Sequence, residues 1–474
     1  MPTLVHPILA LALLVSAQFI IAADYNIVYV ALPSIGNALG FSSQNLQWVI
    51  SSYALAFGGF LLLGGRLGDI IGRRRSFIIA LMLYAVSSLS GGFATSPAML
   101  VVSRAVQGLG GALLLPTTLS LLTTYYAEGP VRNRALGWLG AAGASGGALG
   151  TLLGGLLTST LGWNWTFFVN IPVAAMAVAS AFVLLPRDVP ASARRGVDGP
   201  GALTATAGVT LLVLACVEGP QIGWATGPVL TMLVFSAAFL VGFVGIEARS
   251  QAPLMPLRLF RHPTLPPALI VTALFMSAFG AQYYLLTTYL QAVRHYPPAT
   301  AGLAFLPFSL SIVLGTRIAG KLVAAIGLRR GLLTGFGFGI AGLLTVGMSL
   351  SQDGAYLTHM IPGFLLDGVG QGITWTLIWI AATSGIDASD RGIASGMAST
   401  AQWVGNALGL ALLVAVAARF GLGADGSTAN MIVGLRAAFM AAAGVAMIAC
   451  CMVIGFVGRS RTSIVGPPIS GAVR

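Results

Sequence analysis

The chain alternates between long apolar segments and short polar connections. Each apolar segment holds about 20 residues, enough for a helix to cross the hydrocarbon core at about 1.5 Å per residue. The pattern predicts an all-α membrane protein with 14 transmembrane helices. The expected spans cover residues 8–32, 46–65, 76–95, 98–122, 136–158, 165–186, 202–217, 227–246, 268–290, 300–319, 331–350, 356–380, 393–417 and 434–457.

Composition supports a membrane protein over a soluble one. Hydrophobic residues make up 57% of the 474 residues and charged residues only 8%, whereas soluble domains carry roughly 25% charged residues. The net charge of +12 comes from basic residues in the short connections. An anionic membrane surface therefore explains that charge better than a nucleic acid does. The cysteines lie in apolar segments without metal-ligand spacing.

The basic residues also predict orientation. With the N-terminus inside, roughly 20 Lys and Arg fall on the cytoplasmic side, and the other side holds only Arg294, Arg419 and Arg436. Because positive charge is retained inside, we expect a multi-pass protein of the cell inner (cytoplasmic) membrane with both termini cytoplasmic.

A repeat divides the chain. The sequence GRLGDIIGRRR at Gly65–Arg75 follows span 2, and GKLVAAIGLRR at Gly320–Arg330 follows span 10. We expect two six-helix pseudo-symmetric halves plus two inserted spans, a plan common in secondary transporters. The predicted divisions are an N-terminal bundle (1–186), a linker with spans 7 and 8 (187–262) and a C-terminal bundle (263–474).

Two carboxylates lie inside expected spans, where an ionisable group predicts a functional site. Asp24 in span 1 and Arg104 in span 4 share nearly the same depth. We predict that they couple transport to protons or cations, the alternative being a static buried ion pair. Asp367 in span 12 shares a helix face with Gln371 and Trp375. It is the second predicted coupling group, and a helix–helix hydrogen-bonding stripe is its alternative.

Polar and aromatic side chains recur on single faces of several spans. Such faces around an apolar cavity suit amphipathic cations, although each face alone could be packing. The predicted cavity residues are Gln18, Tyr25, Tyr29, Gln107, Tyr284, Thr287, Gln291, Gln371 and Trp375.

Four stretches match a known family: Gly65–Arg74, Arg104–Gly111, DYNIVYVALP at Asp24–Pro33, and Trp163–Pro172. By these motifs the chain resembles the major facilitator superfamily, in particular its fourteen-span drug:proton antiporters. The resemblance implies a proton-relay role for Arg104.

The loop after span 2 predicts a conformational gate. Asp69 and Arg73 stand four residues apart and would form a cytoplasmic latch that breaks when the transporter changes state. The residues assigned to this gate are Gly65, Asp69, Gly72 and Arg73. The alternative is that the arginines only set topology.

Span 5 departs from the family pattern. Gly150-Thr151 stands where the family usually carries Gly-Pro. The stripe of Gly146, Gly150 and Gly154 remains and predicts close helix packing.

We therefore expect a proton-coupled antiporter that exports amphipathic, cationic drugs or antibiotics by alternating access. Nucleotide-binding and catalytic motifs are missing, so the chain is not expected to be an enzyme, and a proton gradient takes the place of a cofactor. The expected partners are a drug-like substrate, protons and membrane lipids, with no nucleic acid, for a monomeric protein. A lipid or cell-wall precursor flippase and a proton-coupled importer are the alternatives. Span 1 lacks the Glu/Arg cluster of peptide importers.

Overall fold

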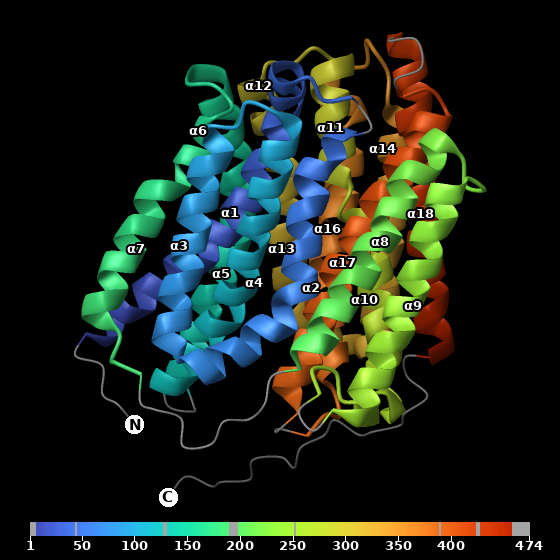
Figure 1. Cartoon of the computed structure of the whole chain (residues 1–474). Helices are drawn as coiled ribbons and strands as arrows, with labels where there is room; N and C mark the ends of the chain where they lie inside the picture. Colours follow the sequence, from blue (N-terminus) through green and yellow to red (C-terminus); the bar gives the residue numbers. More distant parts are fainter. Residues whose placement is uncertain are drawn as a thin grey trace, which may run out of the picture.

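The computed structural model describes most of the chain. The described residues are 6–42, 45–126, 130–188, 198–250, 253–387, 390–422 and 427–456, without the side chains of a few helical positions such as Asp69. Within these ranges the regular structure is helical throughout, and the helices stand side by side as one bundle (Figure 1).

The first part of the chain forms α1 to α7, and the next forms a helix pair, α8 and α9. Their bounds are α1 Pro7–Leu39, α2 Trp48–Ile71, α3 Arg73–Gly92, α4 Pro97–Tyr125, α5 Pro130–Thr160, α6 Trp165–Phe168, α7 Asn170–Leu184, α8 Gly199–Ile222 and α9 Gly227–Arg249. A short 3-10 turn, η1 (Asn45–Gln47), precedes α2.

The last part of the chain forms α10 to α18, preceded by the 3-10 turn η2 (Leu257–Arg261). The bounds are α10 Leu265–Phe279, α11 Gln282–Thr288, the π-helix η3 Tyr289–Val293, α12 Pro298–Ala304, α13 Leu306–Ile326, α14 Leu328–Ser349, α15 Tyr356–His359, α16 Ile361–Thr383, α17 Arg391–Arg419 and α18 Thr428–Phe456.

The predicted spans correspond to these helices. In the described part, 13 segments are long and apolar enough to cross a membrane, and some combine consecutive helices, as in Leu265–Val293. The 24-residue α2 is a possible further span. The prediction of an all-helical membrane fold is confirmed.

The first span is longer than predicted. The expected segment ended at residue 32, before Pro33, but α1 continues through that proline to Leu39. Proline is tolerated inside membrane helices because neighbouring groups satisfy the freed backbone. The helix ends where Gly40 adopts a left-handed conformation (φ 72°) and its N–H bonds Gly36 O.

Close helix pairs define the interior. Helix α1 packs on α5, α2 on α4, and both α13 and α14 on α16. The early and late helices meet where α2 contacts α17 and where α5 contacts α12. The α12 contact lies at the upper end of the bundle in Figure 1. Helix α8, drawn in green, contacts both α2 and α17.

Candidate functional site

Asp24 forms a buried ion pair with Arg104. Helix α1 positions the carboxylate and α4 the guanidinium, with 1% and 0% of these residues exposed. Arg104 Nη1 donates to Asp24 Oδ2 at 2.8 Å, and Gln107, one turn along α4, donates to Asp24 Oδ1 at 2.9 Å. The arginine and the glutamine are also joined at 2.6 Å. The charge on Asp24 is thus matched by one cation and several polar donors.

Three more helices join this network. Asn170, at the start of α7, donates to Asp24 Oδ1 at 2.5 Å, and Ser88 of α3 accepts from Gln107 at 2.8 Å. On α2, Val49 O accepts from Arg104 Nε at 3.0 Å. The guanidinium carbon of Arg104 lies 4.4 Å from the centre of the Tyr53 ring, a cation–π contact. Asp24 thus joins α1 to α4 and α7, and Arg104 and Gln107 extend the network to α2 and α3.

Asp367 has different surroundings. It lies on α16, 1% exposed, and its carboxylate accepts hydrogen bonds from the amides of Gln282 on α11 and Gln371 on α16. The Gln371 amide also donates to Gln282 Oε1, which closes a triangle of three side chains. Among the described residues no Lys, Arg or His forms an ion pair with Asp367. In the described structure, two amides therefore hold the Asp367 carboxylate.

Aromatic side chains separate the two networks. We call Tyr25, Tyr29, Tyr283, Trp403 and Asn406 the seam, because they join α1 to α11 and α17. The hydroxyls of Tyr25 and Tyr29 are 2.9 Å apart, and Asn406 Nδ2 donates to Tyr25 at 2.6 Å. The ring of Tyr25 meets that of Trp403 edge-on at 5.1 Å, and Tyr29 lies 5.7 Å from Tyr283. The seam connects the early and late spans between the two acids.

The sequence profile of one known family covers this site. The Major Facilitator Superfamily profile matches residues 14–410, a range that includes both acids and the seam.

The chain belongs to the Major Facilitator Superfamily.

Relatives of this superfamily member include antibiotic exporters. It is 39% identical over 426 residues to the cephamycin export protein CmcT of Amycolatopsis lactamdurans, covering 89% of this chain and 87% of that protein. It is 37% identical to the puromycin resistance protein pur8 of Streptomyces alboniger, covering 85% and 80%. The multidrug resistance protein Stp of Mycobacterium tuberculosis is 35% identical, with 84% and 74% covered. The chain is thus a superfamily transporter related to drug and antibiotic efflux proteins, and not an enzyme.

Solved transporters share the fold at low identity. The nucleoside transporter NupG matches with a TM-score of 0.68 at 13% identity, covering 95% of this chain and 99% of that one. The peptide transporter PepTSo matches with a TM-score of 0.68 at 17% identity, covering 94% and 97%. These matches support the superfamily fold and leave the substrate open.

The predicted gate residues of this superfamily member lie around the α2–α3 turn. The side chain of Asp69 lies outside the described part of the structure. Arg73 contacts the last turns of α4 through Ser120 O at 3.4 Å and the Thr124 hydroxyl. Gly72 adopts φ 106°, which favours glycine, and a Cβ there would collide with the Asp188 carboxylate. Gly65 faces Pro116 of α4, 3.6 Å from where a Cβ would stand.

The glycine stripe of span 5 faces span 1 of this transporter. A Cβ at Gly146 would stand 2.8 Å from Phe19 O, and one at Gly150 would stand 2.6 Å from Ala23 O. A Cβ at Gly154 would stand closer still to Ile27 O. Real Cβ atoms do not approach carbonyl oxygens so closely, so α1 and α5 could not pack this way with larger residues.

The remaining cavity residues of the transporter are dispersed. Gln18 lies on α1 opposite Gly143 of α5, and Gln291 Nε2 donates to Val30 O at 2.7 Å. Tyr284 and Thr287 are buried on α11. Trp375 lies on α16 against Phe275 and Trp379. The structure joins Gln107 to Asp24, Gln371 to Asp367 and Tyr25 to Tyr29.

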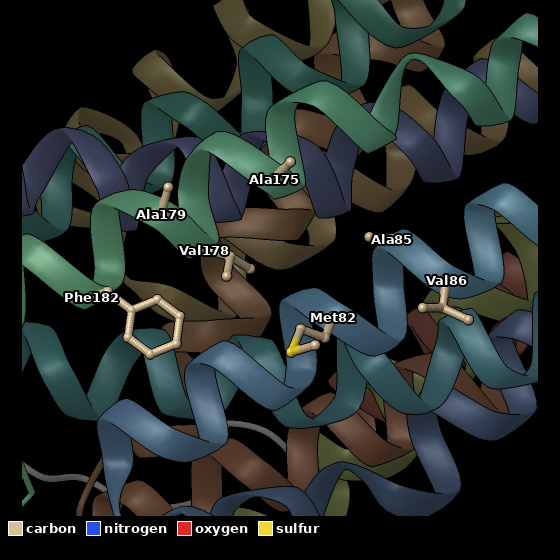
Figure 2. Close-up of a pocket in the computed structure, with 7 residues that line it drawn as sticks. All are labelled: Met82, Ala85, Val86, Ala175, Val178, Ala179 and Phe182. Carbon is tan, nitrogen blue, oxygen red and sulfur yellow. The ribbon is translucent and has the colours of Figure 1, made fainter.

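A groove on this transporter lies apart from the acids. It runs between α3 and α7 and is lined by apolar side chains, among them Met82, Val86 and Phe182, as Figure 2 shows. These three side chains are more than half exposed. An apolar, open lining of this kind suits lipid chains better than it suits a charged substrate.

Several site residues escaped the sequence analysis. Asn170 lay in a motif already matched to the family, but its contact with Asp24 depends on the tertiary fold. Gln282 is an amide in an apolar stretch, and its only signal was that it stands in the same span as the predicted Tyr284, Thr287 and Gln291. Asn406 and Trp403 lie on α17, a span without a carboxylate that would have drawn attention to them.

Proposed function

We propose that this chain is a proton-driven antiporter that exports amphipathic, cationic drug-like compounds across the inner membrane by alternating access. The observation that most favours this function is the contrast between two buried carboxylates. One is paired with an arginine, and the other has no cationic partner among the described residues. A group without a cation can take either a proton or the charge of a substrate. An antiporter that exchanges a proton for a cation requires a carboxylate that can bind each of them in turn.

The proposal gives the two acids different tasks. Asp367 is the site where a proton and a substrate cation alternate, because either one neutralises a carboxylate that is costly to bury alone. Asp24 and Arg104 form the second coupling group. Their pair tightens or loosens as the cavity gains and loses water, and this changes how α1 and α4 pack.

A proton gradient supplies enough free energy for this work. One charge moving down 100 mV yields about 2.3 kcal/mol. At equilibrium that energy supports roughly 50-fold accumulation per proton. The relatives that export cephamycin or confer puromycin and multidrug resistance support a drug-like substrate.

The test is substrate-triggered proton movement in proteoliposomes that enclose a pH-sensitive dye. Lipophilic cations and neutral antibiotics are added under an imposed proton gradient to wild type, Asp24→Asn and Asp367→Asn. We expect cations to trigger flux in the wild type, and both substitutions to abolish or strongly reduce it. Asp353→Asn is the matched control, since Asp353 is exposed in the α14–α15 connection.

The other outcomes separate the alternatives. Folded wild-type protein that moves no protons with any compound, but translocates labelled lipid, would be a flippase. Substrate that moves in the same direction as protons would indicate an importer. Flux that persists in both Asp→Asn variants would refute the assignment of the acids.

A further inference from the structure

Span 9 consists of a fixed part and a part that faces span 1. The fixed part is α10, which packs against α17 through glycines. A Cβ at Gly405 would lie against the backbone of Ala273, and one at Gly409 would lie against that of Ser277. Ser277 Oγ also donates to Gly405 O at 2.8 Å. Such close contacts leave α10 little room to move relative to α17.

The helix is interrupted directly above this contact. Gly280 and Ala281 separate α10 from α11, and α11 runs on into the π-helix η3. Helix α11 contacts α1, and Gln291 of η3 donates to Val30 O at 2.7 Å. Breaks and π-turns inside membrane helices commonly mark functional positions. The segment α11–η3 can therefore leave α1 by bending at Gly280–Ala281 while α10 stays in place.

Gln282 is the first residue of this segment. Its side chain is fully buried, donates to Asp367 Oδ2 and accepts from Gln371. The amide thus ties Asp367 to the segment just above the break. At the break itself, Tyr29 OH donates weakly to Gly280 O at 3.5 Å, and Asn406 lies against Gly280.

We propose that Gln282 is a positioning residue that couples the proton on Asp367 to the movement of α11 and η3 against α1. This inference rests on the proposed function and adds the route by which the proton reaches the seam. Gln282 Nε2 donates to Asp367 Oδ2. A proton on that oxygen puts an O–H where the amide found an acceptor, and the Gln282 side chain then turns its carbonyl toward the acid. A change at the first residue of α11 acts directly on the break.

The residues around Asp367 determine whether its protonation favours or opposes closure of the seam. Gly342 of α14 packs against its backbone, Phe308 and Ser311 of α13 pack beside it at Gly368, and Tyr283 of α11 is a titratable side chain near it. Burying a carboxylate without a cation is costly. Closure of the seam therefore raises the protonated fraction of Asp367, and protonation of Asp367 raises the population of the closed seam.

The experiment measures closure directly in a variant without Cys216, Cys450 and Cys451. Spin labels are placed at Asn37 of α1 and at His295, two residues beyond η3, both exposed. Their separation is measured by double electron–electron resonance at acidic and alkaline pH. In the labelled protein we expect acid to raise the ratio of short to long distances by about tenfold, within the usual range of coupling between sites.

Gln282→Met keeps the side-chain shape and removes the amide, and we expect it to reduce this pH response to less than about twofold. Gln402→Met is the matched control, since Gln402 is a buried glutamine of α17 that bonds neither acid in the described part of the structure. It should retain the full response. If Gln282→Met does not fold, Gln282→Leu removes the amide with a different apolar side chain and provides the same test.

A full pH response in folded Gln282→Met or Gln282→Leu, together with a lost response in Asp367→Asn, would overturn the inference. Failure of the proposed function would appear elsewhere, as a wild type that shows no substrate-triggered proton flux. The two failures are therefore distinguishable, because the distance measurement needs no substrate.

Discussion

At the scale of single residues, the molecule holds two acids at very different electrostatic cost. Asp24 is balanced by Arg104, whereas Asp367 relies on two amides. Removing one member of a buried ion pair leaves the other charge uncompensated, which typically costs about 3–5 kcal/mol, whereas removing both members is far less harmful.

We therefore predict that Arg104→Leu destabilises the protein more than the double variant Asp24→Asn/Arg104→Leu. The single variant strands a buried carboxylate, and the double variant removes both charges. Thermal unfolding of purified protein in detergent, followed by tryptophan fluorescence, measures the difference. Arg75→Leu, at an exposed arginine of α3, is the control. Equal losses in the single and double variants would show that the pair contributes no net charge compensation.

At the scale of elements, close packing depends on positions without side chains. Within α5, Gly150 lies against Ala23 O of α1, while Gly140 has open space where its Cβ would stand. We predict that Gly150→Ala costs about 1–3 kcal/mol through overpacking and that Gly140→Ala costs almost nothing. The folded fraction after mild heating compares them on one helix. Similar losses from both substitutions would mean that α5 adjusts its position freely.

The start of α3 depends on a distant carboxylate. Asp188, beyond the end of α7, accepts from the backbone N–H groups of Arg74 and Arg75 at 2.9 and 3.0 Å. Loss of an N-terminal cap costs about 0.5–2 kcal/mol. We predict that Asp188→Ala speeds hydrogen exchange at these two amides by about 2- to 30-fold. Asp353→Ala should leave them unchanged, and no acceleration in Asp188→Ala would show that water replaces the cap without loss.

Sequence patterns predicted most of these elements, but not their interruptions. Hydropathy located the spans because apolar length is what the bilayer selects. It could not locate the break at Gly280–Ala281, since apolar residues continue across it. Counting residues along the spans predicted that Asp24 and Arg104 share a depth. The triangle around Asp367 could not be predicted fully, because Gln282 joins it from another helix.

At the scale of the whole molecule, orientation remains a prediction from charge. Arg330 and Asp353 flank α14 at its two ends, and both are exposed. With cytoplasmic termini, Asp353→Cys should react with a membrane-impermeant maleimide in intact cells, and Arg330→Cys only after permeabilisation. The cysteine-free background is the control, and the reverse labelling pattern would invert the topology. The divisions at 1–186, 187–262 and 263–474 likewise remain predictions.

Three helices meet at two consecutive glycines of α2. A Cβ at Gly58 would stand 2.6 Å from Trp403 Cβ on α17, and one at Gly59 would stand 2.8 Å from Thr206 Oγ1 on α8. Contacts this tight leave α2 little freedom to move against α8 and α17. Rocking of the bundle would therefore pivot near the point where these three helices cross. A molecule wedged there would slow the turnover of every substrate by the same factor and leave each apparent affinity unchanged. An inhibitor bound where α2, α8 and α17 cross would therefore slow transport to the same extent whatever the chemistry of the exported compound.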